Sequence, residues 1–188
     1  MPKKKLSEYY AKRDLASSGE PAAGRSGSRH PRFVVQRHDA RSLHFDFRLE
    51  IGDVLVSWSV PKGPSLDPRD RRLAVRTEDH PLDYADFEGR IPADDYGGGT
   101  VVVWDVGTFD NLNETTMAAS LDAGHLRVRL HGEKLTGAFS LVRTGLRGGR
   151  EQWLLFKKDD EGADRRRKPA VTQPESVLTG KTNEDFES

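Results

Sequence analysis

The chain has 188 residues, a length that allows one domain with a core and flanking tails. Lys and Arg residues equal Asp and Glu residues in number, so no overall field favours nucleic acid, and any such binding must come from local clusters. The absence of cysteine excludes disulfides, thiolate zinc sites and a cysteine nucleophile. No apolar run is long enough for a membrane span or a signal peptide, so we expect a soluble, cytoplasmic protein.

Residues 1–31 are expected to form a flexible arm. The arm begins with three lysines at positions 3–5, contains a short possible helix over 6–15, and then becomes rich in Ser, Gly, Pro and Arg. A solubilising tail is the simpler interpretation of the lysines, and contact with a phosphate backbone is the alternative.

Residues 32–158 carry the patterns of a β domain. Strands are predicted at 32–37, 43–51, 54–60, 72–77, 100–104, 125–131, 135–143 and 152–158. One core helix is predicted over 113–123, closed by Gly124. About eight strands with short turns and little helix predict an all-β fold, a small closed β-barrel or a sandwich. Residues 159–188 are charged and polar, which predicts a linker or tail.

A long connection without a regular pattern covers residues 78–99. Connections of this length in a compact domain usually serve a site or a lid, which makes His80 and Tyr84 candidates for a functional site. The glycines at 97–99 precede a strand and not a helix, so a bulge or tight turn is favoured over a phosphate-binding loop.

The strongest chemical signal is a strand that alternates from Leu43 onward. Successive side chains of a strand point to opposite faces, so His44, Asp46 and Arg48 share one face, while apolar side chains cover the other. Imidazole and carboxylate can bind the same divalent ion, and His44 and Asp46 are close enough to share one. Turn-prone residues 39–42 could bring His38 back as a third ligand.

Cations near this strand suit a phosphate. Arg48 would face the anionic ligand of the ion, and Lys62 lies in a rigid loop that could present a second cation. A strand with a solvated polar face is the alternative interpretation of the same pattern. That interpretation is preferred for His125 and His131, whose strand also alternates, with weak contact to DNA as the alternative there.

Three blocks of the sequence, with two fragments of the arm, resemble the 3'-phosphoesterase module of bacterial DNA ligase D. The blocks are VQRHDARSLHFDFRLE at 35–50, SWSVPKGPS at 57–65 and EDHPLDY at 78–84, and the arm fragments are KRD at 12–14 and EP at 20–21. Leu15 stands where the family would have Phe, and Phe109 where it would have Trp or Tyr. The chain stops where the ligase polypeptide would continue into a nucleotidyltransferase domain, so we expect a stand-alone enzyme or a module cut from a larger ligase.

This resemblance implies a small β-barrel with a manganese-dependent activity that heals 3' ends during non-homologous end joining. Such enzymes act on 3' ends of DNA or of RNA–DNA primer-templates, releasing a terminal ribonucleoside to leave a 3'-phosphate and then removing that phosphate. Its partners would be end-joining factors such as Ku, a ligase and a polymerase, and the protein would associate with the nucleoid.

The resemblance also assigns roles to individual residues. The metal ligands fall on His38, His44 and Asp46. The phosphate-binding groups fall on Arg48 and His80, with Tyr84 beside them. Arg48, Lys62 and His80 would neutralise charge on the non-bridging phosphate oxygens. Lys62 and Arg72 match residues tied to nucleoside removal, whereas Arg13, Asp14 and Glu20 match arm residues tied to phosphate removal.

Two other functions are compatible with parts of the pattern. A non-haem iron oxygenase uses the same two-histidine, one-carboxylate ligand set. The upstream position of His38 and the crowd of cations favour phosphate chemistry instead. A catalytically silent barrel that binds DNA ends is the second alternative, and it predicts end binding that survives removal of metal.

Overall fold

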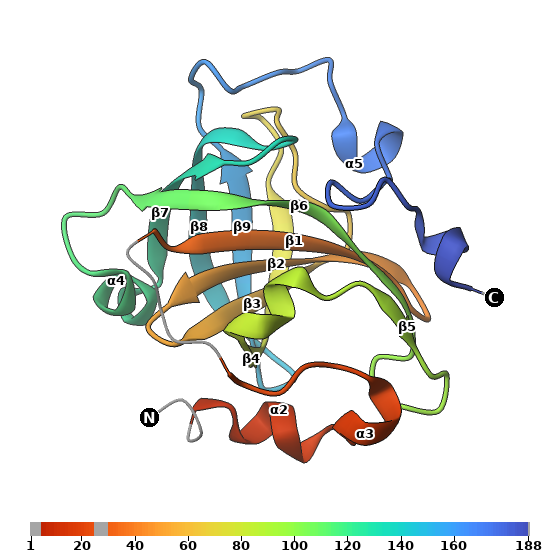
Figure 1. Cartoon of the computed structure of the whole chain (residues 1–188). Helices are drawn as coiled ribbons and strands as arrows, with labels where there is room; N and C mark the ends of the chain where they lie inside the picture. Colours follow the sequence, from red (N-terminus) through yellow and green to blue (C-terminus); the bar gives the residue numbers. More distant parts are fainter. Residues whose placement is uncertain (1–4, 25–29, 188) are drawn as a thin grey trace.

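The computed structural model describes residues 5–24 and 30–187, so the lysines at positions 3 and 4 lie outside it. Strands dominate the described elements (Figure 1). The strands are β1 (Arg32–Asp39), β2 (Leu43–Ile51), β3 (Val54–Val60), β4 (Arg72–Pro81), β5 (Gly89–Ile91), β6 (Gly99–Asn111), β7 (His125–His131), β8 (Thr136–Arg147) and β9 (Arg150–Lys157). The helices are α2 (Ser7–Ala11), α3 (Leu15–Ser18), η1 (Leu82–Asp86), α4 (Met117–Ala123), α5 (Pro169–Thr172) and η2 (Asn183–Phe186).

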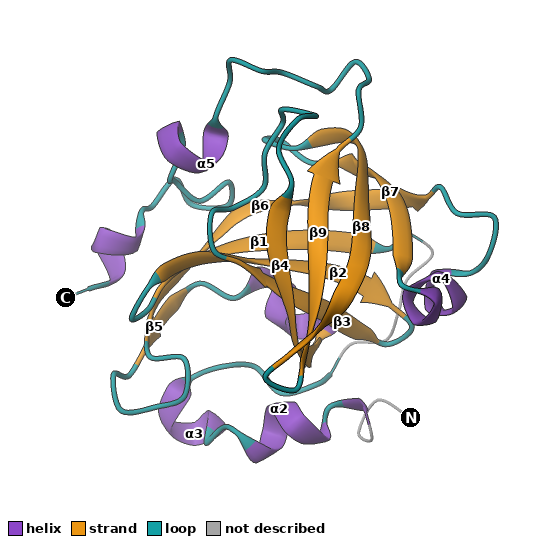
Figure 2. Ribbon diagram, turned by 180° about the vertical axis from the view of Figure 1, so that it is seen from behind, coloured by secondary structure: helices purple, strands orange, loops and turns teal. Residues whose placement is uncertain are grey.

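All nine strands belong to one antiparallel sheet in the order β1-β2-β3-β4-β9-β8-β7-β6-β5. β1 also pairs with β6, so eight of the strands close into a ring, and β5 is added along β6 (Figures 1 and 2). The prediction of an all-β fold with about eight strands and few helices is confirmed. No helix in the described ranges is long and apolar enough to cross a membrane.

The interior of the ring is filled by the apolar face of the alternating strands. Phe45 on β2 packs against Trp104 on β6 with ring centroids 5.2 Å apart, and Trp58 on β3 packs against Trp153 on β9 at 5.5 Å. These rings come from strands that are not neighbours in the sheet, so this face points inward. The polar face of β2 is therefore the outer face of the ring.

The connection after β4 is more regular than its sequence predicts. β4 continues to Pro81 because His80 and Pro81 still pair with β3, opposite Leu55 and Val54, after an irregularity in the register of β3. The 3-10 helix η1 and the short strand β5 occupy much of the rest. The core helix is shorter than predicted, since the Thr116 side chain accepts a hydrogen bond from the Ala119 amide and starts it there.

The arm is docked in the described part of residues 5–24. Leu6 and Tyr9 are fully buried, and the Tyr9 hydroxyl donates a hydrogen bond of 2.6 Å to the Pro21 carbonyl. The Ser17 hydroxyl donates to Asp95 at 2.8 Å, which fastens α3 to the loop before β6. The polar composition predicted a mobile arm, because two apolar residues are too few to form a recognisable sequence pattern. Leu6 and Tyr9 nevertheless dock this segment, together with the hydrogen bonds above.

The polar segment after β9 also lies against the ring (Figure 1). The Gln173 carbonyl accepts hydrogen bonds from Trp104 Nε1 at 2.6 Å and from Lys134 Nζ at 3.1 Å. The fully buried Asn183 donates to the carbonyls of Arg37 and Thr100. Its composition predicted a linker or tail, but here polar groups satisfy buried donors and acceptors of the ring, which composition cannot reveal.

Candidate active site

The hairpin formed by β1 and β2 brings the predicted metal ligands together on the outer face. His38 pairs with His44, and Gln36 pairs with Asp46, in the antiparallel register of the two strands. Residues directly opposite each other in such a pair share a face and lie side by side. The turn over residues 40–42 therefore returns the chain so that His38 stands across from His44.

Three donor atoms converge at this point. Nδ1 of His38 lies 3.6 Å, and Nε2 of His44 lies 3.4 Å, from Oδ2 of Asp46, and the donor atoms all lie within 4.8 Å of one another. These separations are longer than ordinary hydrogen bonds. Two donors about 2.1 Å from a shared ion are themselves about 3–3.4 Å apart, so the distance from His44 to Asp46 matches this spacing and that from His38 to Asp46 is slightly longer.

Backbone carbonyls fix the orientation of both imidazoles. Nε2 of His38 donates to the Gly97 carbonyl at 2.7 Å, and Nδ1 of His44 donates to the Ser42 carbonyl at 3.0 Å. Since a carbonyl can only accept, these nitrogens carry the protons, and the opposite nitrogens keep their lone pairs toward Asp46. Such support of the far ring nitrogen is typical of histidines that bind metals. The residues present therefore fit a divalent cation.

The carboxylate at the centre of this cluster is ionised. Burial alone would raise the pKa of Asp46, but the charge of Arg48 and the two neighbouring imidazoles outweigh it and hold that pKa well below its usual range. Burial lowers the pKa of His44, yet Asp46 more than compensates, so the net pKa of His44 is raised. The cluster is thus anionic at one oxygen and flanked by basic nitrogens.

Arg48 is almost fully buried and is held on several sides. Its Nε donates to Gln36 Oε1 at 2.7 Å, its Nη2 lies 3.4 Å from Asp46, and its guanidinium lies 4.9 Å from the ring centroid of Tyr84. Gln36 in turn donates to the carbonyls of Tyr84, within η1, and of Phe87, directly after η1. This arrangement fixes the guanidinium beside the three predicted metal ligands.

His80 lies between two guanidinium groups. Its Nδ1 is 3.1 Å from Nη1 of Arg48 and 2.9 Å from the Glu78 carbonyl, and its Nε2 is 3.3 Å from Nη2 of Arg13. Burial and then the charges of Arg48 and Arg13 hold the pKa of His80 well below its usual range. His80 is therefore neutral near pH 7 in this structure and offers a hydrogen-bonding nitrogen to the cavity.

The arm contributes a second layer of charged groups. Nε of Arg13 donates to Glu20 Oε2 at 2.9 Å, and its Nη1 donates to Glu78 Oε1 at 3.0 Å. The Tyr84 hydroxyl donates to the same Glu20 oxygen at 2.7 Å, and burial and the Glu20 charge raise the pKa of Tyr84 well above its usual value. The other Glu20 oxygen, Oε1, is buried and has no hydrogen-bond partner in the described part of the chain.

These groups line one cavity of about 440 Å³. The structure brings eight of the eleven predicted residues to its wall, namely Arg13, Glu20, His38, His44, Asp46, Arg48, His80 and Tyr84. The cavity is large enough for a phosphate group and part of a nucleoside.

Three predicted residues lie outside the wall of this cavity. Lys62 is exposed in the loop after β3, and Arg72 begins β4, half-buried, with Nη2 3.5 Å from Asp70. Asp14 is exposed and caps α3, because its Oδ1 accepts a hydrogen bond from the Ala16 amide. Asp14 is thus placed to orient the arm next to Arg13.

Sequence reasoning missed three residues that support the cavity. Gln36 could have been found, since it shares the strand parity of His38 and faces Asp46 in a simple hairpin register. Gly97 supplies the carbonyl that orients His38, but the sequence indicated only a turn at this glycine. Glu78 anchors Arg13 across 65 residues of chain, and no local pattern announces such a contact.

The chain is similar to known proteins over the region that builds this site. Residues 36–143 match the family model described as the DNA ligase D 3'-phosphoesterase domain. The multifunctional non-homologous end joining protein LigD of Pseudomonas aeruginosa is 49% identical over 97% of this chain and 22% of that protein. The corresponding DNA repair protein of Mycobacterium tuberculosis strain H37Rv is 41% identical over 81% of this chain and 20% of that protein.

A third relative gives the same result. The LigD protein of Mycolicibacterium smegmatis is 39% identical over 84% of this chain and 21% of that protein. The chain thus spans about a fifth of the length of the curated relatives that it matches. Because the family model covers more than half of the chain, the protein belongs to the DNA ligase D 3'-phosphoesterase domain family.

Proposed function

We propose that this protein is a metal-dependent phosphoesterase that heals 3' ends of DNA during non-homologous end joining. It would remove a terminal ribonucleoside to leave a 3'-phosphate and then remove that phosphate to leave a 3'-hydroxyl. The observation that carries the proposal is the convergence of His38 Nδ1, His44 Nε2 and Asp46 Oδ2 beside buried arginines. Membership in the phosphoesterase family and the names of the relatives support it.

The proposed cofactor is Mn²⁺. Two imidazoles and one carboxylate form a mixed donor set that suits first-row divalent ions, and the resemblance to the ligase D module favours manganese among them. A bound divalent cation would supply Lewis-acid polarisation of the phosphoryl group and neutralise developing charge.

The other residues of the cavity would bind and orient the phosphate. Arg48 and Arg13 present fixed positive charge, and the neutral His80 between them presents a hydrogen-bonding nitrogen. Preorganised groups of this kind supply much of the stabilisation of a phosphoryl-transfer transition state. The unpartnered Oε1 of Glu20 would accept a hydrogen bond from a protonated phosphate oxygen or a water molecule.

The three residues outside the cavity would act indirectly or on a longer substrate. Asp14 would act as a positioning residue, since its cap on α3 holds the arm that carries Arg13. Lys62 and Arg72 would contact the nucleic acid beyond the cavity during nucleoside removal, which agrees with the exposure of Lys62. We propose a ligase, a polymerase and Ku as the partners of this chain, because the names of its relatives place them in non-homologous end joining.

An assay with two substrates tests this function. One duplex carries a 3'-phosphate and the other a single 3'-ribonucleotide, and each is incubated after removal of metal and again with Mn²⁺. We expect chelation to abolish both conversions and Mn²⁺ to restore them. Because ligating imidazoles must be unprotonated, more Mn²⁺ should be needed as the pH falls. Undiminished turnover in excess chelator would contradict the metal site.

A further inference from the structure

A second polar hollow adjoins the candidate active site. Its volume is about 450 Å³, and it is lined by the start of the arm, by residues 76–79 of β4 and by residues 148–151 at the tip of the β8–β9 hairpin. It shares Thr77, Glu78 and Arg150 with the candidate active site. The second hollow is therefore the neighbouring space through which a strand would leave the candidate active site, along a path between α2 and the hairpin, which face each other in Figure 2.

The acidic residues along this path are already paired. Glu8 lies 3.0 Å from Lys12, Asp79 lies 3.8 Å from Arg76, and Glu151 lies 3.6 Å from Arg76. Glu78 pairs with Arg13 and Lys12. In contrast, Arg147 and Arg150 have no carboxylate within 4.0 Å in the described part of the chain, and both are exposed. The positive charge left unpaired along the path, among the described residues, is therefore that of Lys5 at the start of the arm and of the two arginines at the hairpin tip.

The geometry of the hairpin places these two charges next to each other. Arg147 pairs directly with Arg150, and the two-residue turn between them has positive φ angles at both Gly148 (60°) and Gly149 (77°), as a tight hairpin turn requires. Residues directly opposite each other share a face, so both guanidinium groups leave from the same side. Like charges in this position destabilise a hairpin. An anion between them would remove that penalty.

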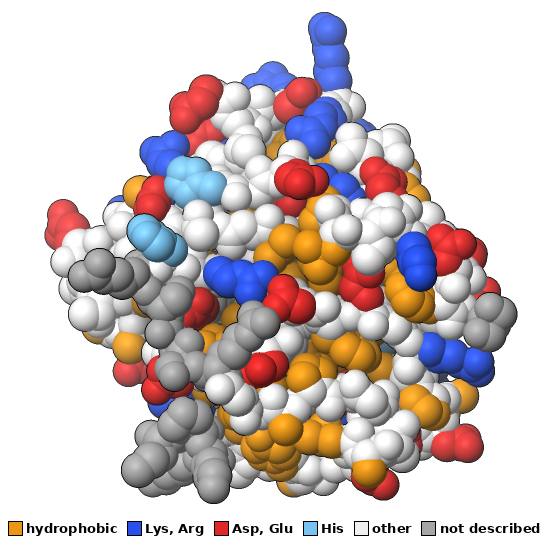
Figure 3. Space-filling view, viewed as in Figure 1, with side chains coloured by type: hydrophobic (Ala, Val, Ile, Leu, Met, Phe, Trp, Pro, Cys, Tyr) orange, Lys and Arg blue, Asp and Glu red, His pale blue; other side chains and the backbone are white. Residues whose placement is uncertain are grey.

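A polyanion that enters the cavity with its 3' end is the ligand that this arrangement suits. The remainder of its strand must leave the cavity, and Arg150 lines both the cavity and the outward path. No overall field attracts a polyanion, because net charge is zero and basic and acidic side chains are interspersed on the face in Figure 3. Contacts to phosphates by arginine fix the register of a protein on nucleic acid.

We propose that the tip of the β8–β9 hairpin, residues 147–150, binds the sugar–phosphate backbone of the nucleic acid strand whose 3' end occupies the candidate active site. The proposal rests on the proposed function and deepens it by assigning the direction in which the strand leaves the cavity. Arg147 and Arg150 each contact one phosphate, and the glycines allow close approach because nothing lies within 4 Å of a Cβ placed on either.

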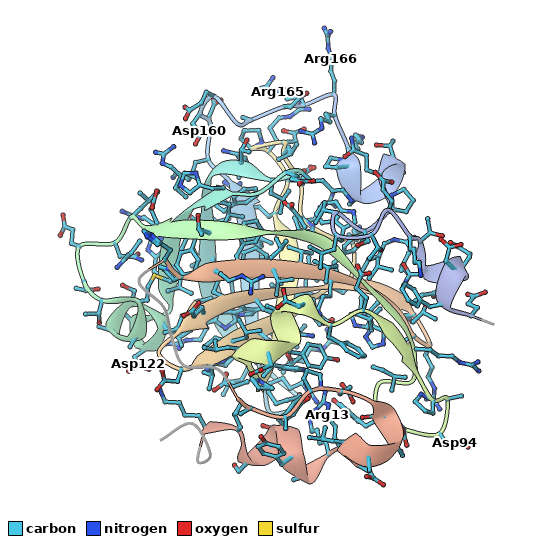
Figure 4. All side chains as sticks on the ribbon, viewed as in Figure 1. Arg13, Asp94, Asp122, Asp160, Arg165 and Arg166 are labelled. Carbon is cyan, nitrogen blue, oxygen red and sulfur yellow. The ribbon has the colours of Figure 1, made fainter. Side chains whose placement is uncertain are left out.

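The test compares two double variants. Arg147→Ala/Arg150→Ala removes the hairpin charges, and Arg165→Ala/Arg166→Ala removes two exposed charges at the opposite end of the molecule from Arg13 (Figure 4). Binding of a duplex with a 3'-phosphate is measured over a series of salt concentrations without metal. Loss of two phosphate contacts should weaken binding roughly 10- to 60-fold near 0.1 M salt and lower the salt slope by about 1.4–1.8. The control should match the parent chain.

Two further measurements make the test specific. Arg147→Lys/Arg150→Lys keeps both charges and should recover most of the affinity, and thermal melting confirms that each variant is folded. With Mn²⁺, the alanine variant should show its loss in KM. An unchanged Kd and salt slope in the alanine variant, or an equal loss in the control, would overturn the docking site. Binding through the hairpin without any end processing would instead refute the proposed function and support the docking site.

Discussion

The two faces of β2 are both buried, but by different means. On the inner face, Phe45, Phe47 and Leu49 are covered by side chains from across the ring. On the outer face, Asp46 and Arg48 are only 8% and 3% exposed, which disagrees with the alternative interpretation of a polar face open to solvent. The arm and the segment that carries η1 cover that outer face (Figure 1).

This contrast separates residues that hold the fold from residues that carry chemistry. Apolar burial is favourable without directional partners. Burial of charge is costly unless each group is paired and hydrogen-bonded, and even then it contributes little net stability. The outer face meets that condition through specific pairs such as Arg13 with Glu20 and Arg48 with Asp46. The proposed function accounts for these buried charges on the outer face, and the following substitutions test it.

The largest effect is expected at a proposed metal ligand. His44→Ala removes one of three donors, and with it several kcal/mol of charge stabilisation in the transition state, so release of 3'-phosphate should fall by more than about 1000-fold. His44 is only partly buried and makes one hydrogen bond to backbone, so the metal-free melting temperature should stay near that of the parent chain. Rates with saturating Mn²⁺ and melting curves measure both quantities.

The contrast between the two faces of β2 would be contradicted if the His44→Ala variant were largely unfolded and its remaining folded fraction were still active. Asp46→Ala provides a second check. It should lose the same activity but also some stability, because Arg48 would keep a buried charge without its carboxylate. Equal stability for the two variants would contradict the role assigned to the Arg48 pair.

The inner face should give the opposite result. Phe47→Ala deletes a fully buried aromatic ring that packs against Phe33 and Trp58, at a cost of roughly 3–5 kcal/mol in the free energy of unfolding. Activity per folded molecule should persist at low temperature. Denaturant unfolding measures the loss. His131→Ala is the matched control on an exposed strand position and should stay within about 0.5 kcal/mol of the parent chain.

The role of the arm gives a smaller effect. Arg13→Gln removes a fixed charge beside His80 and should lower release of 3'-phosphate roughly 100-fold, as loss of one transition-state donor does elsewhere. Asp14→Ala removes only the cap of α3, worth about 1 kcal/mol, so its activity should fall less. Asp14→Ser keeps a capping oxygen and should recover the parent rate. Failure of the serine variant to recover would give Asp14 a direct role.

Much of the ring could be predicted from sequence because strand alternation is a local signal. The alternation of apolar and polar residues along β2 predicts which side chains face into the ring and which face outward. The short turn after β1 also made it possible to predict that His38 lies close to His44. Leu43 departs from the apolar pattern, being 41% exposed at the start of the strand.

The cover of the outer face could not be predicted, because it depends on contacts between distant segments. Arg13 meets Glu78 and His80 only after the arm has docked on β4, and docking depends on the isolated apolar residues Leu6 and Tyr9. The docking of the polar segment after β9 also depends on distant contacts, since the Asn183 side chain donates hydrogen bonds to the carbonyls of Arg37 and Thr100. In both cases the composition of the segment resembles that of a solvated tail.

The smallest effect is the dependence of stability on pH that His80 introduces. The pKa of His80 in the folded protein lies well below the unfolded value of about 6.5, so below that pH the unfolded chain binds a proton that the folded chain excludes. The free energy of unfolding should therefore fall as the pH drops through 6.5, by up to about 1.4 kcal/mol per pH unit. His80→Gln lacks this proton and should fall less steeply between pH 7.5 and 5.5.

The parent chain and the His80→Gln variant must be compared without metal, so that only the folding equilibrium is measured. His44 has a raised pKa and contributes in the opposite sense, with stability that is present at low pH and lost as the pH rises through its folded pKa. It is present in both proteins, so its contribution cancels in the difference between the two curves. Parallel curves would show that His80 accepts a proton in the folded state despite lying between Arg13 and Arg48, and the outer face would then be more solvated than its contacts indicate.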